Sequence, residues 1–194
     1  MDVMKRLYLR GLNTTYTGNV SARASDESKF WITPTSRDKY NLRPEDLSYI
    51  DITSGERIFG EKESSEYRLH LMIYRKRNDV KAVIHAHPPH TYALTRGISR
   101  SSFIKDRFNE FYQSSYEALN YLGKYDLVGN YDPGSWELAE KVSEKFYRDK
   151  EISVVLMLNH GIVAIGRNLS EALNRVEVFE DLAKTYILEN LWIK

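Results

Sequence analysis

Hydrophobic and polar positions change their period along the chain, and this change separates predicted strands from predicted helices. Short runs of aromatic and β-branched residues occupy positions 30–33, 49–52 and 57–59, with turn residues such as Ser54-Gly55 between them. Runs of this kind are typical of a meander of antiparallel strands. The first third of the chain is therefore predicted to be mostly strand.

A helical period follows this meander. Tyr67, Leu71 and Tyr74 recur at spacings of four and three, which predicts a helix over 66–77. The serine pair Ser64-Ser65 precedes it, and serine is a common helix cap.

The second half of the chain has a clear pattern as well. An amphipathic helix is predicted over 136–148, and apolar strands are predicted over 152–158 and 162–165. The three residues Asn159-His160-Gly161 between the two strands indicate a tight turn, and hence an antiparallel hairpin. A last long helix begins after the cap residue Ser170.

These elements predict a mixed α/β fold with a central, mainly antiparallel sheet flanked by helices. The stretch 97–131 is rich in aromatic residues but has no clear period, so it is left unassigned. We expect one domain over residues 1–194, because a chain of this length buries roughly 70% of its unfolded surface.

Composition narrows the range of partners. The net charge is +1 and charged residues are scattered, so we expect neither a nucleic acid nor a membrane partner. There is no cysteine, so a metal site has to use His, Asp or Glu. No signal peptide or membrane-spanning run is found, and we expect a cytoplasmic protein.

His85-Ala86-His87 is the segment with the clearest chemistry. It ends the apolar run 80–84 and is followed by Pro88-Pro89, which indicates the end of a strand. Strand side chains alternate between faces, so both imidazoles point the same way and can grip a divalent metal. His160, in the predicted hairpin turn, would complete a three-histidine site with an open position. Taken singly, each of these histidines is also compatible with an ordinary structural role.

The same segment has the histidine spacing of the metallo-β-lactamase signature, because His90 follows His87 by three residues. That family places an aspartate ligand where Pro89 stands here. The proline argues against this hydrolase alternative.

Three segments combine turns with hydroxyl or amide groups and could cradle a phosphate: 17–19, 33–36 and Ser64-Ser65. Glu66 directly follows the serine pair, at the start of the predicted helix, and is a candidate acid/base. Each of these features alone also fits plain turn and cap chemistry.

Taken in order, five motifs resemble those of the class II aldolase/adducin family over residues 17–188. They are Gly18-Asn19-Val20-Ser21, Ile32-Thr33-Pro34-Thr35, Ser64-Ser65-Glu66 with His70, Ala82-Val83-Ile84-His85-Ala86-His87-Pro88, and Asn159-His160-Gly161. The segments 17–19 and 64–66 look most like those of family members that act on L-fuculose 1-phosphate.

The resemblance implies a set of roles. A zinc ion, or another divalent metal, would be held by His85, His87 and His160, and Glu66 would transfer a proton beside it. The phosphate of a sugar phosphate would bind Asn19, Thr35, Ser36, Ser64 and Ser65. The family also implies a ring-like homotetramer with active sites at subunit interfaces. A tyrosine of the neighbouring subunit would donate a proton, and we expect Tyr116 in that role, with Tyr112 next.

The implied activity is that of a class II aldolase. Such an enzyme reversibly cleaves a ketose 1-phosphate to dihydroxyacetone phosphate and an aldehyde, through a metal-stabilised enediolate. A sugar-phosphate 4-epimerase or a methylthioribulose-1-phosphate dehydratase on the same fold are the alternatives, as is a non-catalytic adducin-like module. The retained histidines and Glu66 favour an enzyme.

Three departures from the family pattern bear on specificity. Ser36 replaces the usual glycine, and the helix before Thr17 is expected to be short. The chain stops at Lys194, so we expect it to lack the C-terminal tail that closes over the site in some members.

Overall fold

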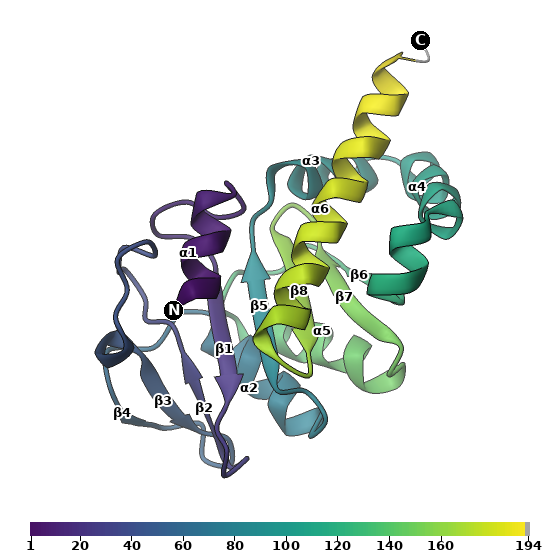
Figure 1. Ribbon diagram of the computed structural model, residues 1–194. Helices are drawn as coiled ribbons and strands as arrows, with labels where there is room; N and C mark the ends of the chain where they lie inside the picture. The colour runs from purple at the N-terminus through teal and green to yellow at the C-terminus, as the bar shows by residue number, and fades with distance from the viewer. Residues whose placement is uncertain (193–194) are drawn as a thin grey trace.

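A single eight-stranded sheet forms the centre of the computed structural model, which describes residues 1–192 (Figure 1). The strand order is β4-β3-β2-β1-β5-β8-β7-β6, and every neighbouring pair is antiparallel except β6 and β7. The mixed α/β class with a mainly antiparallel sheet is thus confirmed. The strands are β1 (Asn19–Arg23), β2 (Lys29–Ile32), β3 (Ser48–Asp51), β4 (Arg57–Phe59), β5 (Ala82–Ala86), β6 (Lys124–Val128), β7 (Ile152–Met157) and β8 (Gly161–Gly166).

Helices cover both faces of the sheet (Figure 1). One face packs against α2 (Tyr67–Lys76) and α5 (Trp136–Arg148), and the other packs against α1, α3, α4 and α6. None of the helices among residues 1–192 is long and apolar enough to cross a bilayer. The remaining elements are α1 (Asp2–Leu9), the 3₁₀ turn η1 (Pro44–Asp46), α3 (Pro89–Ile98), α4 (Ser102–Ser114), the π-helical turn η2 (Ala118–Leu122) and α6 (Leu169–Trp192).

The alternation of β5 decides which side of the sheet carries the chemistry. Ala82, Ile84 and Ala86 pack into the apolar core under α6, whereas Val83 packs into the core under α2 and α5. His85 lies two residues after Val83, so it faces α2 and the segment that leads into that helix.

The unassigned stretch 97–131 folds as α4, η2 and β6. Its aromatic residues pack against α6: the ring of Phe108 lies 5.8 Å from that of Phe179 and 5.2 Å from that of Tyr186, and Tyr125 lies 5.5 Å from Phe179. Two helices and a strand share this cluster, so no single helical or strand period runs through the sequence.

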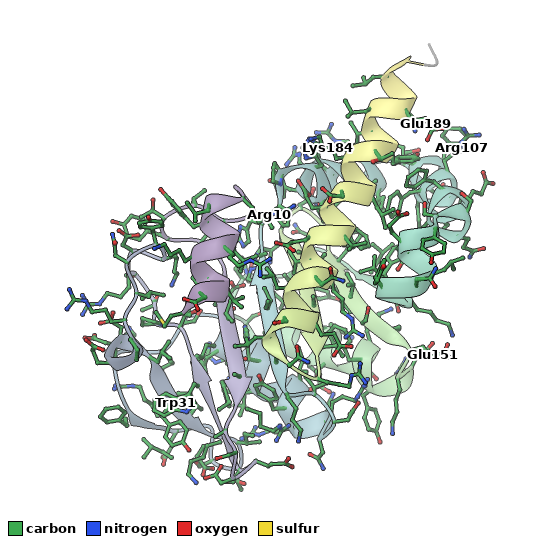
Figure 2. All side chains as sticks on the ribbon, in the orientation of Figure 1. Arg10, Trp31, Arg107, Glu151, Lys184 and Glu189 are labelled. Atoms are coloured by element: carbon green, nitrogen blue, oxygen red, sulfur yellow. The ribbon has the colours of Figure 1, made fainter. Side chains whose placement is uncertain are left out.

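The beginning of the chain holds two elements that the pattern did not identify, α1 and β1. α1 is fastened to α6 because Arg6 and Arg10 both approach Glu177, at 3.5 and 3.4 Å, and Arg10 lies between the two helices in Figure 2. β1 is a central strand of mixed polar and apolar residues, without the apolar alternation that predicts a strand. The expected end of the chain at Lys194 lies outside the described residues.

A carboxylate from α6 caps the helix that follows the histidine pair. Glu180 is buried, and its Oε1 accepts from the backbone N–H of His90 at 2.9 Å and its Oε2 from that of Thr91 at 2.8 Å. The Thr91 hydroxyl also donates to Oε2, at 2.9 Å. The residue before α3 is Pro88, which has no side-chain donor or acceptor, so Glu180 takes the place of a local cap.

Replacing Glu180 with alanine should therefore lower the free energy of unfolding by about 1–3 kcal/mol, because buried N–H groups lose their acceptor. Urea denaturation measures this change. Asp181→Ala, one residue further on the exposed side of α6, is the matched control and should stay within about 0.5 kcal/mol of wild type. Equal effects of the two substitutions would contradict the capping role.

Candidate active site

Three imidazoles meet where β5 ends and the β7–β8 hairpin turns. β5 and β8 are antiparallel, with Ala86 opposite Ile162, so the turn that carries His160 lies beside the end of β5. The ring centroids of His85 and His87 are 4.6 Å apart, and that of His160 lies 4.8 Å from the first and 5.2 Å from the second. The structure thus brings together all three histidines that the sequence singled out.

Gly161 permits this close approach. A Cβ atom at this position would lie 2.4 Å from the carbonyl oxygen of Ala86 and 3.3 Å from ring atoms of His85 and His87. Any other residue would force the hairpin away from β5. The glycine after His160 is therefore a requirement of the cluster geometry.

Glu66 completes the cluster from the start of α2. Its Oε2 lies 3.0 Å from Nε2 of His85, and its Oε1 lies 3.3 Å from Nε2 of His160. Nε2 of His87 lies 2.7 Å from Nε2 of His85. One ligand atom from each of the four residues falls within 4.8 Å of the others.

The arrangement fits a divalent cation. Nδ1 of His85 lies 3.0 Å from the carbonyl oxygen of Ile162, which can only accept, so Nδ1 carries the hydrogen and Nε2 presents its lone pair to the cluster. Oε1 of Glu66 is buried and has no hydrogen-bond partner among the described residues. Imidazole nitrogens with a carboxylate oxygen are a donor set that zinc prefers.

Protonation states at neutral pH suit a cation at Glu66 and His87; at His85 burial lowers the pKa, but the adjacent Glu66 outweighs this and raises it, so a bound cation would displace a proton from that ring. Burial opposes ionisation of Glu66, but the adjacent His85 and His160 hold its pKa well below the usual range. Burial, together with the other two imidazoles, lowers the pKa of His87 to about 3. An ionised carboxylate and a neutral imidazole are the forms that bind a metal ion.

Behind Glu66, a chain of buried hydrogen bonds leads into the core (Asn19 and Ser21 are on β1, His70 and Tyr74 on α2). Nδ2 of Asn19 donates to Oε2 of Glu66 at 3.1 Å, and Oδ1 of Asn19 faces Nε2 of His70. On the other side of that ring, the Ser21 hydroxyl lies 2.7 Å from Nδ1 and 2.8 Å from the Tyr74 hydroxyl.

The direction of each bond in this chain follows from its ends. An ionised Glu66 only accepts, so Asn19 turns its amide nitrogen toward it and its oxygen toward His70. His70 therefore carries its hydrogen on Nε2 and accepts from Ser21 through Nδ1. Burial, reinforced by the nearby His85, lowers the pKa of His70 to about 3, so the ring is neutral. This chain of hydrogen bonds fixes the orientation of the Glu66 carboxylate.

A cavity of about 280 Å³ opens beside the cluster. Of the residues that the sequence proposed for the site, those that line it are Asn19, Thr35, Ser64, Ser65, Glu66, His87 and His160. The hydroxyl of Ser64 accepts from the backbone N–H of Glu66 at 3.2 Å, which orders the approach to α2. Imidazoles and a carboxylate thus share one cavity with hydroxyl groups from two separate turns.

Residues 1–187 match the family model described as the class II aldolase and adducin N-terminal domain. The chain belongs to the class II aldolase/adducin family. The family resemblance inferred from five short motifs is confirmed.

Members of this family with different activities are similar to the chain. An L-fuculose phosphate aldolase of Methanocaldococcus jannaschii is 36% identical, over 100% of this chain and 96% of its own length. A 3-oxo-tetronate 4-phosphate decarboxylase of Haemophilus influenzae is 30% identical, over 94% and 82%, and a methylthioribulose-1-phosphate dehydratase of Methylococcus capsulatus is 32% identical, over 89% and 83%. The similarity supports an enzyme and leaves its reaction open among these.

A solved structure of an L-fuculose 1-phosphate aldolase has the same fold. It superposes with a TM-score of 0.81 at 28% identity and covers 100% of this chain and 85% of its own. The sheet and helices described above are therefore those of the class II aldolases.

Ser36 departs from the expectation for a class II aldolase phosphate loop. Its φ is +52°, a left-handed conformation that costs most residues roughly 1–2 kcal/mol, which explains why glycine is usual at this position. The residue is exposed and does not line the cavity, unlike the neighbouring Thr35. The structure does not bring the Ser36 side chain to the other candidate phosphate-binding groups.

The two tyrosines considered as proton donors differ in accessibility. Tyr116, just after α4, is 69% exposed and lies outside the cavity, as a donor to a neighbouring subunit would. Tyr112 is buried, and its hydroxyl donates to the carbonyl oxygen of Gly123 at 3.0 Å. Tyr112 is therefore occupied within its own chain, and Tyr116 stays a prediction.

Lys39 lines the cavity although no sequence pattern pointed to it. A lone lysine in a polar turn is normally exposed, yet Lys39 is only 3% exposed. Its Nζ donates to the carbonyl oxygen of Pro34, and burial lowers its pKa to about 8. Only the folded structure reveals this cation beside Thr35, Ser64 and Ser65.

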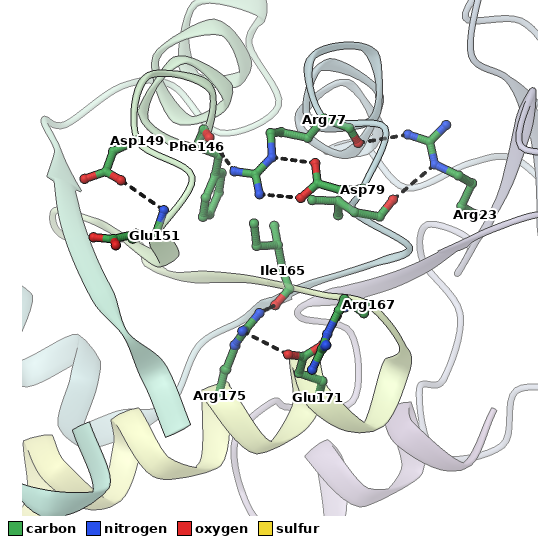
Figure 3. Close-up of polar contacts among 11 residues, drawn as sticks. Arg23, Arg77, Asp79, Phe146, Asp149, Glu151, Ile165, Arg167, Glu171 and Arg175 are labelled. Atoms are coloured by element: carbon green, nitrogen blue, oxygen red, sulfur yellow. Dashed lines mark hydrogen bonds and ion pairs between the residues drawn. The ribbon is translucent and has the colours of Figure 1, made fainter. Parts of the chain in front are cut away.

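A larger cavity, of about 630 Å³, lies at the opposite end of the sheet, between the starts of β6 and β7 and the end of β8 (Figure 3). Its main charged groups are paired with one another. Arg77 binds the carboxylate of Asp79 at 2.7 and 2.8 Å, and Arg175 binds Glu171 at 3.0 Å and the carbonyl oxygen of Ile165 at 2.6 Å. No imidazole of the described chain lines this cavity, so its size does not make it the catalytic site.

The cluster predicts a selective loss of metal. His87→Ala removes one of three converging nitrogens and should lower zinc affinity at least about 10-fold, measured as metal content after dialysis against graded chelator. His90→Ala is the matched control, because that imidazole lies three residues away, against Glu180 and outside the cluster. Retention of zinc by the His87 variant at the wild-type level would contradict the assignment.

Burial of Lys39 predicts that the stability difference between the wild type and Lys39→Met depends on pH in phosphate-free buffer. Between the buried pKa of about 8 and the ordinary value of 10.5, the unfolded state binds more protons, so wild-type stability rises with pH. Lys39→Met lacks this group and should be more stable below pH 8, by at most about 3 kcal/mol. Urea unfolding of both proteins should show the difference shrinking toward pH 10.5, and a constant difference would contradict a buried unpaired ammonium.

Proposed function

We propose that this chain is a zinc-dependent class II aldolase. It would reversibly cleave a ketose 1-phosphate, resembling fuculose 1-phosphate, to dihydroxyacetone phosphate and an aldehyde. The observation that carries the proposal is the shared cavity, in which an ionised, rigidly held Glu66 lies between an imidazole cluster and a group of hydroxyls. The 36% identity to an L-fuculose phosphate aldolase over the full chain supports this choice.

In this proposal His85, His87 and His160 hold zinc or another divalent ion. A bound divalent ion supplies a positive charge that stabilises negative charge developing on a substrate carbonyl oxygen. The histidines are positioned for this by the β5–β8 pairing and by the hydrogen bond from His85 to the Ile162 carbonyl.

Glu66 moves the proton. Its Oε2 is held by Asn19, whereas Oε1 has no hydrogen-bond partner among residues 1–192, so Oε1 is the oxygen that takes a proton from the hydroxymethyl carbon of dihydroxyacetone phosphate. The C–H electron pair forms the enediolate double bond, and the carbonyl electron pair moves onto its oxygen. The electron pair of the enediolate double bond then forms the bond to the aldehyde carbon while the ketone carbonyl re-forms, and Tyr116 of a neighbouring copy protonates the aldehyde oxygen.

The phosphate is assigned to the hydroxyl side of the cavity. Thr35, Ser64 and Ser65 offer hydroxyl donors there, and the N-terminus of α2 adds a favourable dipole. One amide hydrogen of Asn19 already goes to Glu66, so its second amide hydrogen is the one that can meet the phosphate.

A homotetramer with active sites between subunits belongs to the same proposal. Tyr116 has to act in a neighbouring site, because it lies outside the cavity of its own chain. Three large apolar side chains on α4 and η2 are also exposed, which favours a protein–protein contact on these elements. They are Phe103, Leu119 and Tyr121.

A second candidate is a different reaction of a sugar phosphate in the same cavity. The 32% identity to a methylthioribulose-1-phosphate dehydratase and the 30% identity to a 3-oxo-tetronate 4-phosphate decarboxylase favour dehydration or decarboxylation of a sugar phosphate. A sugar-phosphate 4-epimerase would also use an imidazole cluster with a phosphate site. A non-catalytic module would have no need of the ionised Glu66 beside three imidazoles.

The deciding experiment incubates the zinc-loaded protein with dihydroxyacetone phosphate and short aldehydes. We expect a new carbon–carbon bond, detected by mass spectrometry and NMR, only when both reactants are present. Absence of this product, with epimerisation, dehydration or decarboxylation of a sugar phosphate instead, would overturn the aldolase proposal.

Glu66→Gln should keep the bound metal but lower kcat at least about 100-fold, the usual contribution of acid/base catalysis. Glu63→Gln is the matched control, since Glu63 pairs with Arg57 on the surface and lies outside the cavity. Unchanged turnover in the Glu66 variant would remove this residue from the mechanism.

A further inference from the structure

Lys39 is a buried cation at the hydroxyl side of the cavity. Its backbone N–H donates to the carbonyl oxygen of Thr15 at 2.9 Å, and its Nζ donates to the carbonyl oxygen of Pro34. The residue is almost fully shielded from solvent and lines the same cavity as Thr35 and Ser64. The fold therefore places an ammonium group at a fixed position next to the hydroxyls.

This ammonium group has no counter-ion within the described part of the chain. None of the ion pairs among residues 1–192 includes Lys39, and its one side-chain partner is a neutral carbonyl. Glu66 is the carboxylate that lines the same cavity, and it is directed to His85, His160 and Asn19 instead. A buried, unpaired ammonium is unfavourable, so proteins normally supply it with an anion.

The groups around Lys39 specify which anion fits. Hydroxyls donate hydrogen bonds without adding charge, and the N-terminus of α2 adds only a partial positive charge. Without Lys39, the hydroxyl side would hold a phosphate dianion with no full positive charge. With Lys39, it combines a charge-assisted donor with the hydroxyls of Thr35, Ser64 and Ser65, as a phosphomonoester requires.

We propose that Lys39 is the phosphate-binding cation of this enzyme, and that its bond to Pro34 couples phosphate binding to the position of the loop 33–39. The inference rests on the proposed function, since it names the charged partner of the substrate's phosphate. It assigns Lys39 to binding: the residue neutralises the phosphate and leaves proton transfer to Glu66.

The coupling to the loop follows from the geometry. Pro34 and Thr35 are attached through the backbone to the segment before α2. Pro34 forms an isolated antiparallel β-bridge with Glu63, and the Thr35 N–H donates to the carbonyl oxygen of Lys62 at 3.1 Å. Lys39 closes the other end of the same loop onto Pro34. A phosphate held by Lys39, Thr35 and Ser64 would therefore join both ends of the loop to the start of α2.

The test compares inorganic phosphate binding by the wild type, Lys39→Gln and Lys62→Gln, all without substrate turnover. The glutamine side chain in the Lys39 variant keeps an N–H donor for the Pro34 carbonyl but lacks the charge. Lys62 is the matched control, because it is an exposed lysine beside the same loop and does not line the cavity. Isothermal titration should show at least about 10-fold weaker phosphate binding in the Lys39 variant and less than about a 2-fold change in the control.

A kinetic measurement separates binding from a merely structural role. In Lys39→Gln we expect the KM for dihydroxyacetone phosphate to rise at least about 10-fold with kcat nearly unchanged. The turnover of unphosphorylated dihydroxyacetone should be equal in wild type and variant. A fall in kcat with both substrates would show general damage to the site and overturn the proposal.

A measurement on the wild type alone covers the case in which the variant does not fold. With ¹³C-labelled lysine, NMR should show phosphate raising the pKa of one unusually acidic lysine ammonium. No change on addition of phosphate would overturn the proposal, as would equal phosphate affinity of the wild type and Lys39→Gln. These results are independent of carbon–carbon bond formation, so a failed aldolase assay and a failed Lys39 assignment are distinguishable.

Discussion

The antiparallel pairing of β5 with β8 is the constraint on which the rest of the site depends. It sets Ala86 opposite Ile162 and thereby brings two distant parts of the chain, the end of β5 and the β7–β8 turn, within van der Waals distance. Only a glycine at position 161 allows this approach. A shift of the register by one residue would turn His85 to the opposite face of the sheet, away from Glu66.

The two faces of the sheet are both packed against apolar cores, but their buried polar groups differ. The α6 face contains the aromatic cluster with α4 and the Glu180 cap on α3. Within the core of the α2 face, Asn19, His70 and Ser21 form the chain of hydrogen bonds behind Glu66. A buried polar chain of this kind is stable only if every member is satisfied, which links the acid/base to the packing of α2.

Local patterns predicted the parts of this molecule whose causes are local. The strand that ends at His85-Ala86-His87 and the hairpin at His160 follow from short-range alternation and turn chemistry. The pattern did not predict β1 because Asn19 and Ser21 make this strand polar, and their hydrogen-bond partners at the start of α2 and within it are about fifty residues away. The start of α3 depends on an acceptor 90 residues further along the chain. The burial of Lys39 likewise follows from tertiary packing, so no local period could indicate it.

The polar chain behind Glu66 ends at an amide, and this has a consequence for where protons travel. The Asn19 amide orients the carboxylate, but it does not release and regain a proton as a hydroxyl or imidazole does. Burial raises the pKa of Tyr74, at the far end, well above its usual range, so this phenol does not supply one either. The interior behind Glu66 therefore neither supplies protons to this carboxylate nor takes protons from it. A proton taken up on Oε1 has the cavity as its way out, so the same proton is available to return to the carbon from which it came for as long as a ligand closes the cavity.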